Sequence, residues 1–104
     1  MFARQVSIRL KFNMLSDYHQ IFVNEVLPML RRQEGFKDAI TMSNVGSRDV
    51  IAITFWENRA SAEASNTTAY QEVLLTLGKL LEEKPIVQTF EAVMSTLHEV
   101  AVTQ

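Results

Sequence analysis

Apolar and polar residues alternate strictly near the start of the chain. Apolar side chains occupy positions 6, 8, 10 and 12, and polar side chains occupy the positions between them. This period-two pattern predicts a β-strand with one apolar face.

The pattern then changes to the spacing of a helix. Apolar residues recur every four positions from Tyr18 to Leu30, and Ser16-Asp17 stand before them with side chains suited to cap the first turn. Pro28 lacks the N–H that would bond to the carbonyl four residues back, so we expect a kink near Asn24–Leu27. Gly35 is expected to end the helix in the left-handed conformation.

Two strands joined by a turn are expected next. Residues 36–43 and 50–56 read as strands, and Asn44-Val45-Gly46-Ser47 between them carries turn-forming residues. An antiparallel hairpin is therefore predicted. The strand at 50–56 is apolar on both faces, so we expect both faces to be covered, one by helices of this chain and the other by a partner subunit.

The second helical region is expected in two pieces. Asn58 is placed to cap a short helix over residues 59–65. Thr68-Ala69-Tyr70-Gln71 matches a capping box, in which the first and last side chains bond to backbone amides at a helix start. Apolar residues at 70, 73, 74, 77 and 81 mark one face of that helix. Pro85 bars further helix, and residues 86–100 predict a long final strand.

The order strand–helix–strand–strand–helix–strand is that of a ferredoxin-like α+β domain. We expect a four-stranded antiparallel sheet with the helices on one face. The 104 residues suit one domain, residues 1–104. Because a domain of this size buries a modest core, pairing with a second copy would readily add buried area.

Composition excludes several classes of function. The net charge is −2 and no basic cluster exceeds Arg31-Arg32, so we expect no nucleic-acid partner, which would require a basic face. The chain has no Cys, which removes disulfides, thiol catalysis and Cys-based zinc sites. We find neither the apolar segment of a signal peptide nor a run able to span a bilayer, and expect a soluble cytoplasmic protein with no membrane partner.

Four features occur one after another along the chain. They are the alternation of the first strand, Leu27-Pro28-Met29-Leu30 followed by Gly35-Phe36, Phe55-Trp56-Glu57 at the end of the third strand, and Ala69-Tyr70-Gln71 at the start of the last helix. In this combination the chain resembles the antibiotic biosynthesis monooxygenase (ABM) domain of the dimeric α+β barrel superfamily, over about residues 3–97.

The resemblance implies a homodimer whose two sheets face each other as a barrel, with the helices outside. Some members of the family oxidise polycyclic aromatic or quinol-like substrates with O₂ and neither metal nor flavin, others degrade haem, and many have no known activity. Haem-degrading members use an Asn, a Trp and a haem-ligating His on the second helix. Asn13 and Trp56 are present here, but no His lies between His19 and His98, so haem degradation is disfavoured.

Five side chains are candidates for a pocket between the sheet and the helices. The ligand-binding walls would be Trp56, Phe22 and Phe90, and the catalytic polar contacts would be Tyr70 and Asn66. Trp56 can stack on a ligand or donate its N–H, or it can pack in the core or at a dimer interface. Tyr70 can donate its phenol or help to form a substrate anion, or it can lie at the edge of the core. Asn66 can bond to a bound carbonyl or serve only a turn.

No metal or cofactor is expected. His19 and His98 show no metal-site spacing, and neither a P-loop nor a dinucleotide-binding glycine motif occurs. The leading hypothesis is a cofactor-independent monooxygenase that acts on a planar aromatic or quinol-like molecule in an apolar pocket. The alternative is a non-catalytic dimeric α+β barrel protein that binds a small molecule in the same cavity or fills the cavity with its own side chains.

Overall fold

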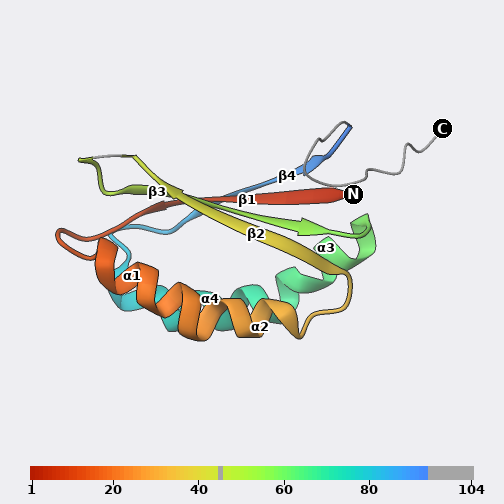
Figure 1. Ribbon diagram of the computed structural model, residues 1–104, viewed down its shortest axis with the longest axis horizontal. Helices are drawn as coiled ribbons and strands as arrows, with labels where there is room; N and C mark the ends of the chain where they lie inside the picture. The colour runs from red at the N-terminus through yellow and green to blue at the C-terminus, as the bar shows by residue number, and fades with distance from the viewer. Residues whose placement is uncertain (45, 94–104) are drawn as a thin grey trace.

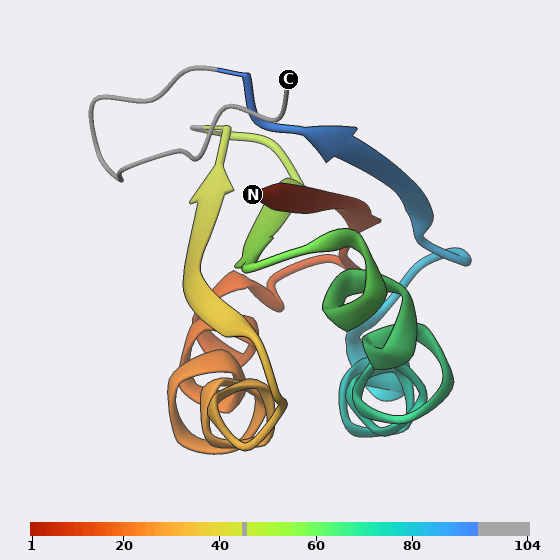
Figure 2. The ribbon, with the colours of Figure 1, turned by 90° about the vertical axis from the view of Figure 1, so that its right-hand side faces the viewer.

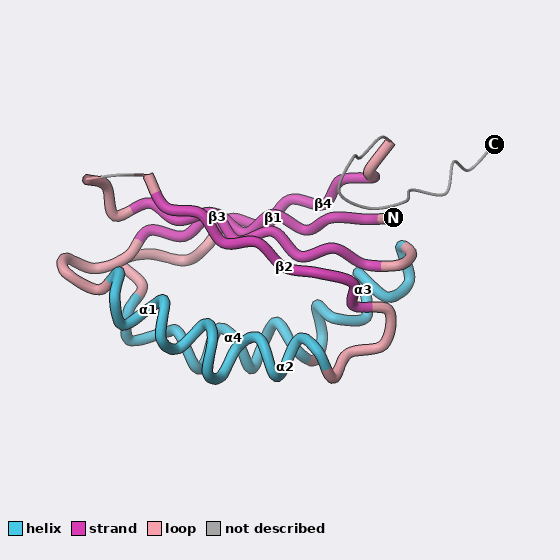
Figure 3. Tube along the Cα trace, in the orientation of Figure 1, coloured by secondary structure: helices cyan, strands magenta, loops and turns pink. Residues whose placement is uncertain are grey.

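The computed structural model describes residues 1–44 and 46–93, and its elements follow the expected order (Figure 1). One antiparallel sheet with the order β2-β3-β1-β4 is formed by β1 (Phe2–Arg9), β2 (Phe36–Ser43), β3 (Asp49–Trp56) and β4 (Ile86–Glu91). The helices all lie on one face of this sheet (Figure 3). The ferredoxin-like α+β fold is confirmed.

Two helical layers lie side by side against the sheet (Figure 2). The first layer contains α1 (Leu15–Ile21), η1 (Phe22–Val26) and α2 (Leu27–Arg31), and the second contains α3 (Arg59–Thr67), α4 (Ala69–Leu77) and the short η2 (Gly78–Leu80). The core lies between these layers and the inner faces of β1 and β3. Its buried apolar residues are Ile8, Leu10, Tyr18, Phe22, Val26, Leu30, Val50, Ala52, Trp56, Ala62, Leu77 and Leu80.

A π-helical turn, η1, lies where a kink was expected in the first helical layer. At the end of η1 the Leu27 N–H donates to the Phe22 carbonyl, five residues back. The next residue is Pro28, which has no N–H to continue an α-helical ladder. The expected cap at Ser16-Asp17 is wrong. The helix begins at Leu15 without a side-chain cap, and Asp17 lies in the first turn, where its charge suits the helix dipole.

Gly35 has the expected left-handed conformation, with a φ of 81°. It stands beyond the end of the helix, because α2 ends at Arg31, so the expected position at the helix terminus is wrong. A Cβ at Gly35 would overlap the side chain of Ser61 on α3. The residue therefore allows the turn before β2 to approach the second helical layer closely.

The two pieces of the second helical region begin by different means. The Asn58 Oδ1 accepts the Ser61 N–H at 2.9 Å, which confirms the cap of α3. The expected capping box at Thr68 is wrong, because Thr68 makes no side-chain cap bond to its helix. Its hydroxyl instead donates to the Gln33 Oε1 at 3.2 Å and to the Ala64 carbonyl, so it ties the second helical layer to the end of the first.

Two strand boundaries differ from expectation. Phe12 lies beyond β1 and is 74% exposed, so the alternation ends before it. The last strand, β4, ends at Glu91, and positions 94–100 of the expected strand, with His98, lie outside the described residues. The face of the sheet away from the helices exposes apolar side chains, namely Ile40, Met42, Ile51, Ile86 and Phe90.

Candidate functional site

A narrow cavity of about 60 Å³ lies between the sheet and the two helical layers. Three of the five residues singled out from the sequence line it, namely Trp56, Tyr70 and Phe22. We call it the core cavity. Pockets for drug-sized ligands measure roughly 300–1,000 Å³, and a cavity that takes up benzene measures about 150 Å³. In this conformation the core cavity is too small for a planar aromatic molecule.

Trp56 is a wall of the core cavity and a member of the core at once. Its side chain is 1% exposed, and its indole Nε1–H donates to the Thr54 Oγ1 at 2.9 Å. The Phe36 ring meets it edge-on, with centroids 5.5 Å apart and an interplanar angle of 76°. Because the N–H is already bonded, Trp56 offers a ligand its apolar ring surface and no free donor.

Tyr70 lies under a buried arginine that the sequence reasoning missed. Arg4 on β1 is 4% exposed, its Cζ stands 5.4 Å from the centre of the Tyr70 ring, and its Nη1 donates to the Ala62 carbonyl at 3.2 Å. Burial raises the pKa of the Tyr70 phenol, partly offset by the Arg4 charge. Burial also lowers the pKa of Arg4. Tyr70 is therefore a neutral hydrogen-bond donor at neutral pH rather than a base.

Arg4 was recognisable from the strand pattern. It is in phase with Val6 and Ile8, so it points to the face that the helices cover. A charged residue in the apolar phase of a strand is a buried charge.

Asn66 and Phe90 do not line the core cavity. Asn66 is exposed on α3, one position past the buried Ser65, so it points away from the sheet. Phe90 is paired with Ala3 and is 49% exposed on the outer face of the sheet, whereas its neighbour Thr89 is paired with Arg4. The period of two places Phe90 on the face opposite to the cavity.

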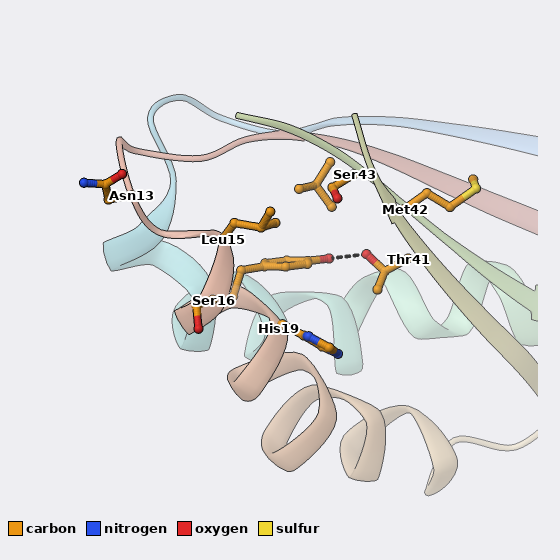
Figure 4. Close-up of a pocket in the computed structure, with 9 residues that line it drawn as sticks. Asn13, Leu15, Ser16, His19, Thr41, Met42 and Ser43 are labelled. Carbon is orange, nitrogen blue, oxygen red and sulfur yellow. Dashed lines mark hydrogen bonds between the residues drawn. The ribbon is translucent and has the colours of Figure 1, made fainter. Parts of the chain in front are cut away.

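A second and larger hollow lies where the start of α1 meets the edge strand β2. This edge cleft has a volume of about 630 Å³. Figure 4 shows Leu15, Ser16 and His19 on one side and Thr41, Met42 and Ser43 from β2 on the other. It was not expected from the sequence, because residues 13–19 and 41–50 meet only in the folded chain.

Tyr18 separates the edge cleft from the core cavity, because its side chain lines both. Its hydroxyl is hydrogen-bonded to the Thr41 Oγ1 at 2.9 Å, the dashed line in Figure 4. The ring is 2% exposed and packs on Phe22, with centroids 5.8 Å apart. Burial raises the pKa of the Tyr18 phenol, partly offset by the Thr41 bond. Tyr18 was expected only as part of the apolar stripe of the helix.

The described residues that line the two hollows offer no metal centre. Across residues 1–44 and 46–93, no three His, Cys, Asp or Glu side chains are grouped to hold a metal ion. In the same described ranges, no helix has both the length and the apolar character needed to cross a membrane. A location in the cytoplasm stays a prediction.

No protein-family model matches the chain, and no curated protein matches its sequence. Solved structures match its fold. A protein of unknown function from Nitrosomonas europaea has a TM-score of 0.75 at 16% identity, over 95% of both chains. SnoaB, a cofactor-independent oxygenase from Streptomyces nogalater, has a TM-score of 0.75 at 11% identity, over 93% of this chain and 97% of SnoaB. An antibiotic biosynthesis monooxygenase has a TM-score of 0.70 at 12% identity, over 90% of this chain and 100% of its own. The chain therefore has the fold of ABM proteins.

Proposed function

We propose that this protein is a cofactor-independent monooxygenase of the ABM type, and that its substrate is a planar phenol, quinol or anthrone bound in the core cavity. The observation that carries the proposal is an aromatic-walled cavity between sheet and helices, in a fold that a cofactor-independent oxygenase shares. The apolar walls suit a ring system, and the nearby polar side chains are hydrogen-bond donors that suit an oxygen on that ring.

The reaction needs little from the protein beyond a suitable environment. An anthrone loses a proton from its methylene group to solvent water before the cavity encloses it, and the bound enolate gives electrons to O₂. One oxygen atom becomes the new ring carbonyl and the other leaves as water, so each O₂ takes four electrons from one substrate molecule. The cavity would exclude water and stabilise the enolate oxygen through fixed donors.

The side chains take distinct roles under this proposal. Tyr70 donates its O–H to the substrate oxygen, and Trp56 and Phe22 hold the ring from the sides. Asn66 and Phe90 take no part, because both lie off the cavity.

The substrate would enter through the edge cleft, whose volume of about 630 Å³ is within the range of ligand pockets. Tyr18 forms the partition between the two hollows, so its ring must turn away from Thr41 to join them. Phe22 and Val26, which line the core cavity from the same helical segment as Tyr18, belong to the π-helical turn. Such turns are rare in helices and frequent at functional sites. We propose that this turn changes its conformation when the substrate enters.

Oxygen consumption tests the proposed function. Wild-type protein should consume one O₂ per anthrone or quinol-like substrate oxidised in a metal-free buffer. Tyr70→Phe and Trp56→Phe should lower the rate, while Phe12→Leu, an exposed aromatic position with 74% accessibility, should not. The proposal would be refuted if wild-type protein consumed no O₂ with any anthrone or quinol-like substrate tested, or if Tyr70→Phe and Trp56→Phe both consumed it at undiminished rates. Binding without consumption would instead favour the non-catalytic binding protein.

The protein is also proposed to be a homodimer. The outer face of the sheet exposes an apolar surface, in which Ile51 is 36% exposed and Met42 is 48% exposed, and the two are paired across β2 and β3. A second copy facing this surface would cover it. Sedimentation should show a dimer at micromolar concentration, dissociated by Ile51→Asp and unaffected by Leu75→Asp on the exposed side of α4. A wild-type monomer would contradict the proposal.

A further inference from the structure

Within the described residues, Arg4 is a buried positive charge without a negative partner. Arg9, Arg48 and Arg59 each form an ion pair with a carboxylate at the protein surface. Arg4 is 4% exposed, and within residues 1–44 and 46–93 its guanidinium has only the Ala62 carbonyl and the face of the Tyr70 ring as partners. A guanidinium stays protonated at neutral pH. Burying it without a counter-charge is costly, and a bound anion would supply that counter-charge.

Among the described residues, the protein supplies Arg4 with one hydrogen-bond acceptor, and no guanidinium nitrogen of Arg4 is both fully buried and without a partner, so the remaining donors are accessible from outside the protein. A guanidinium has five N–H donors, and one hydrogen bond of Arg4 is made within the described part of the chain. The Ala62 carbonyl that accepts it also accepts the Ser65 hydroxyl at 2.7 Å. That carbonyl is therefore fully used, and it supplies a dipole rather than a charge.

The neighbouring hydroxyl groups are donors as well. Thr54 is the cross-strand neighbour of Arg4, and because its Oγ1 accepts from Trp56, its own hydrogen is free to donate. The Tyr70 phenol is neutral at neutral pH and makes no hydrogen bond within the described residues. No Asp, Glu, His, Asn or Gln side chain from the described ranges lines the core cavity. A site with a positive charge and several donors, and without a carboxylate, is complementary to an anion.

We propose that Arg4 is the anion-binding residue of the core cavity, and that the ligand is an aromatic molecule bound with an ionised oxygen, a phenolate or an enolate, against the guanidinium. Thr54 and Tyr70 add hydroxyl donors, and Trp56 packs on the ring. The proposal rests on the proposed function in placing the ligand in this cavity. It goes further by assigning the charge state of the ligand and the residue that selects it. Arg4 would then favour ionisation of a bound phenol.

The probes for the test are 4-nitrophenol, whose phenolate has its own visible absorbance band, and 4-nitroanisole, which has the same ring but cannot ionise. Wild-type protein should bind 4-nitrophenolate more tightly than 4-nitroanisole, and the bound phenol should ionise at lower pH than the free one. Arg4→Met should weaken 4-nitrophenolate binding roughly 10- to 100-fold, the range expected for losing a hydrogen-bonded charge, and leave 4-nitroanisole binding within about twofold. Arg4→Lys should retain the preference for the anion. Arg9→Met, on the same strand at the surface, is the matched control.

The outcomes separate this role from a purely structural one. If Arg4 only holds α3 and α4 against β1, Arg4→Met should weaken the binding of both probes equally and should leave the ionisation of bound 4-nitrophenol unshifted. If Arg4→Met fails to fold, two other measurements test the proposal: the pH at which 4-nitrophenol bound to wild-type protein ionises, and the anion preference of Arg4→Lys. Binding of neither probe, or of both with equal affinity at all pH values, overturns the proposal. Anion-selective binding without oxygen consumption would support the anion-binding role of Arg4 and refute the oxygenase function. Oxygen consumption without anion selectivity would support the oxygenase function and refute the role of Arg4.

Discussion

Filling the core cavity should stabilise the protein and abolish its ligand site. Ala52 is 8% exposed, lies on β3 and lines the cavity. Ala52→Val adds two carbon atoms to this wall, in a strand, where a β-branched side chain is favoured.

The size of the gain follows from the available space. Two newly buried carbon groups contribute about 1.6 kcal/mol, at about 0.8 kcal/mol each. The empty volume of about 60 Å³ costs about 1.4 kcal/mol, at roughly 24 cal/mol per Å³. Because the valine must also fit the shape of the cavity, we expect a gain of about 1 kcal/mol. In a domain of this length, that gain would raise the melting temperature by about 4–8 °C.

Urea denaturation followed by the fluorescence of Trp56, the one Trp of the chain, measures the stability, and 4-nitrophenol binding measures the site. Ala3→Val is the control, since Ala3 does not line the core cavity and is paired with Phe55 in the outward phase of the sheet. The reasoning fails if Ala52→Val lowers the free energy of unfolding by more than about 1 kcal/mol, the cost of overpacking a filled core. Unchanged 4-nitrophenol affinity would equally refute it.

Three further predictions follow from local geometry. Burial raises the pKa of both tyrosines, Tyr18 and Tyr70, so an alkaline absorbance titration should show neither ionising at the ordinary value of about 10. Because the phenols ionise at lower pH in the unfolded chain than in the folded one, the free energy of unfolding should fall as the pH rises above about 10 toward the raised folded-state pKa values. A phenol that titrates at the ordinary pKa would contradict its burial. Gly35→Ala should cost more than about 1 kcal/mol in chemical denaturation, because its φ is 81° and the new Cβ would overlap Ser61, and an unchanged midpoint would contradict this. Asn58→Ala should cost about 1 kcal/mol through loss of the α3 cap, and no measurable loss would mean that the cap contributes nothing.

The parts of the fold that were predictable are those governed by local periodicity. The alternation of β1 and the apolar run of β3 are visible in the sequence because each side chain simply follows the pleat. Pro28 predicted an irregularity in the first helix, but it did not predict that the irregularity would be a π-helical turn. The capping box at Thr68 failed because a tertiary partner, Gln33, takes its hydroxyl, and such partners are invisible to local reasoning.

The candidate site was predictable only in part. Trp56 and Tyr70 do line one cavity, as expected from their place at a strand end and on an apolar helical face. Phe90 was misplaced because the phase of β4 depends on its pairing with β1, which no local signal fixes. Arg4 carried a readable signal, a charge in the apolar phase of a strand, whereas the edge cleft had none because its two sides are distant in sequence.

The most direct test of the central claim, that the core cavity is the substrate site, is a crystal structure of the protein with a bound planar phenol. We predict ligand density between Trp56 and Tyr70, with the phenol oxygen within hydrogen-bonding distance of the Arg4 guanidinium and with Tyr18 displaced from Thr41. Ligand density confined to the edge cleft, with the Tyr18–Thr41 hydrogen bond intact, would contradict the account.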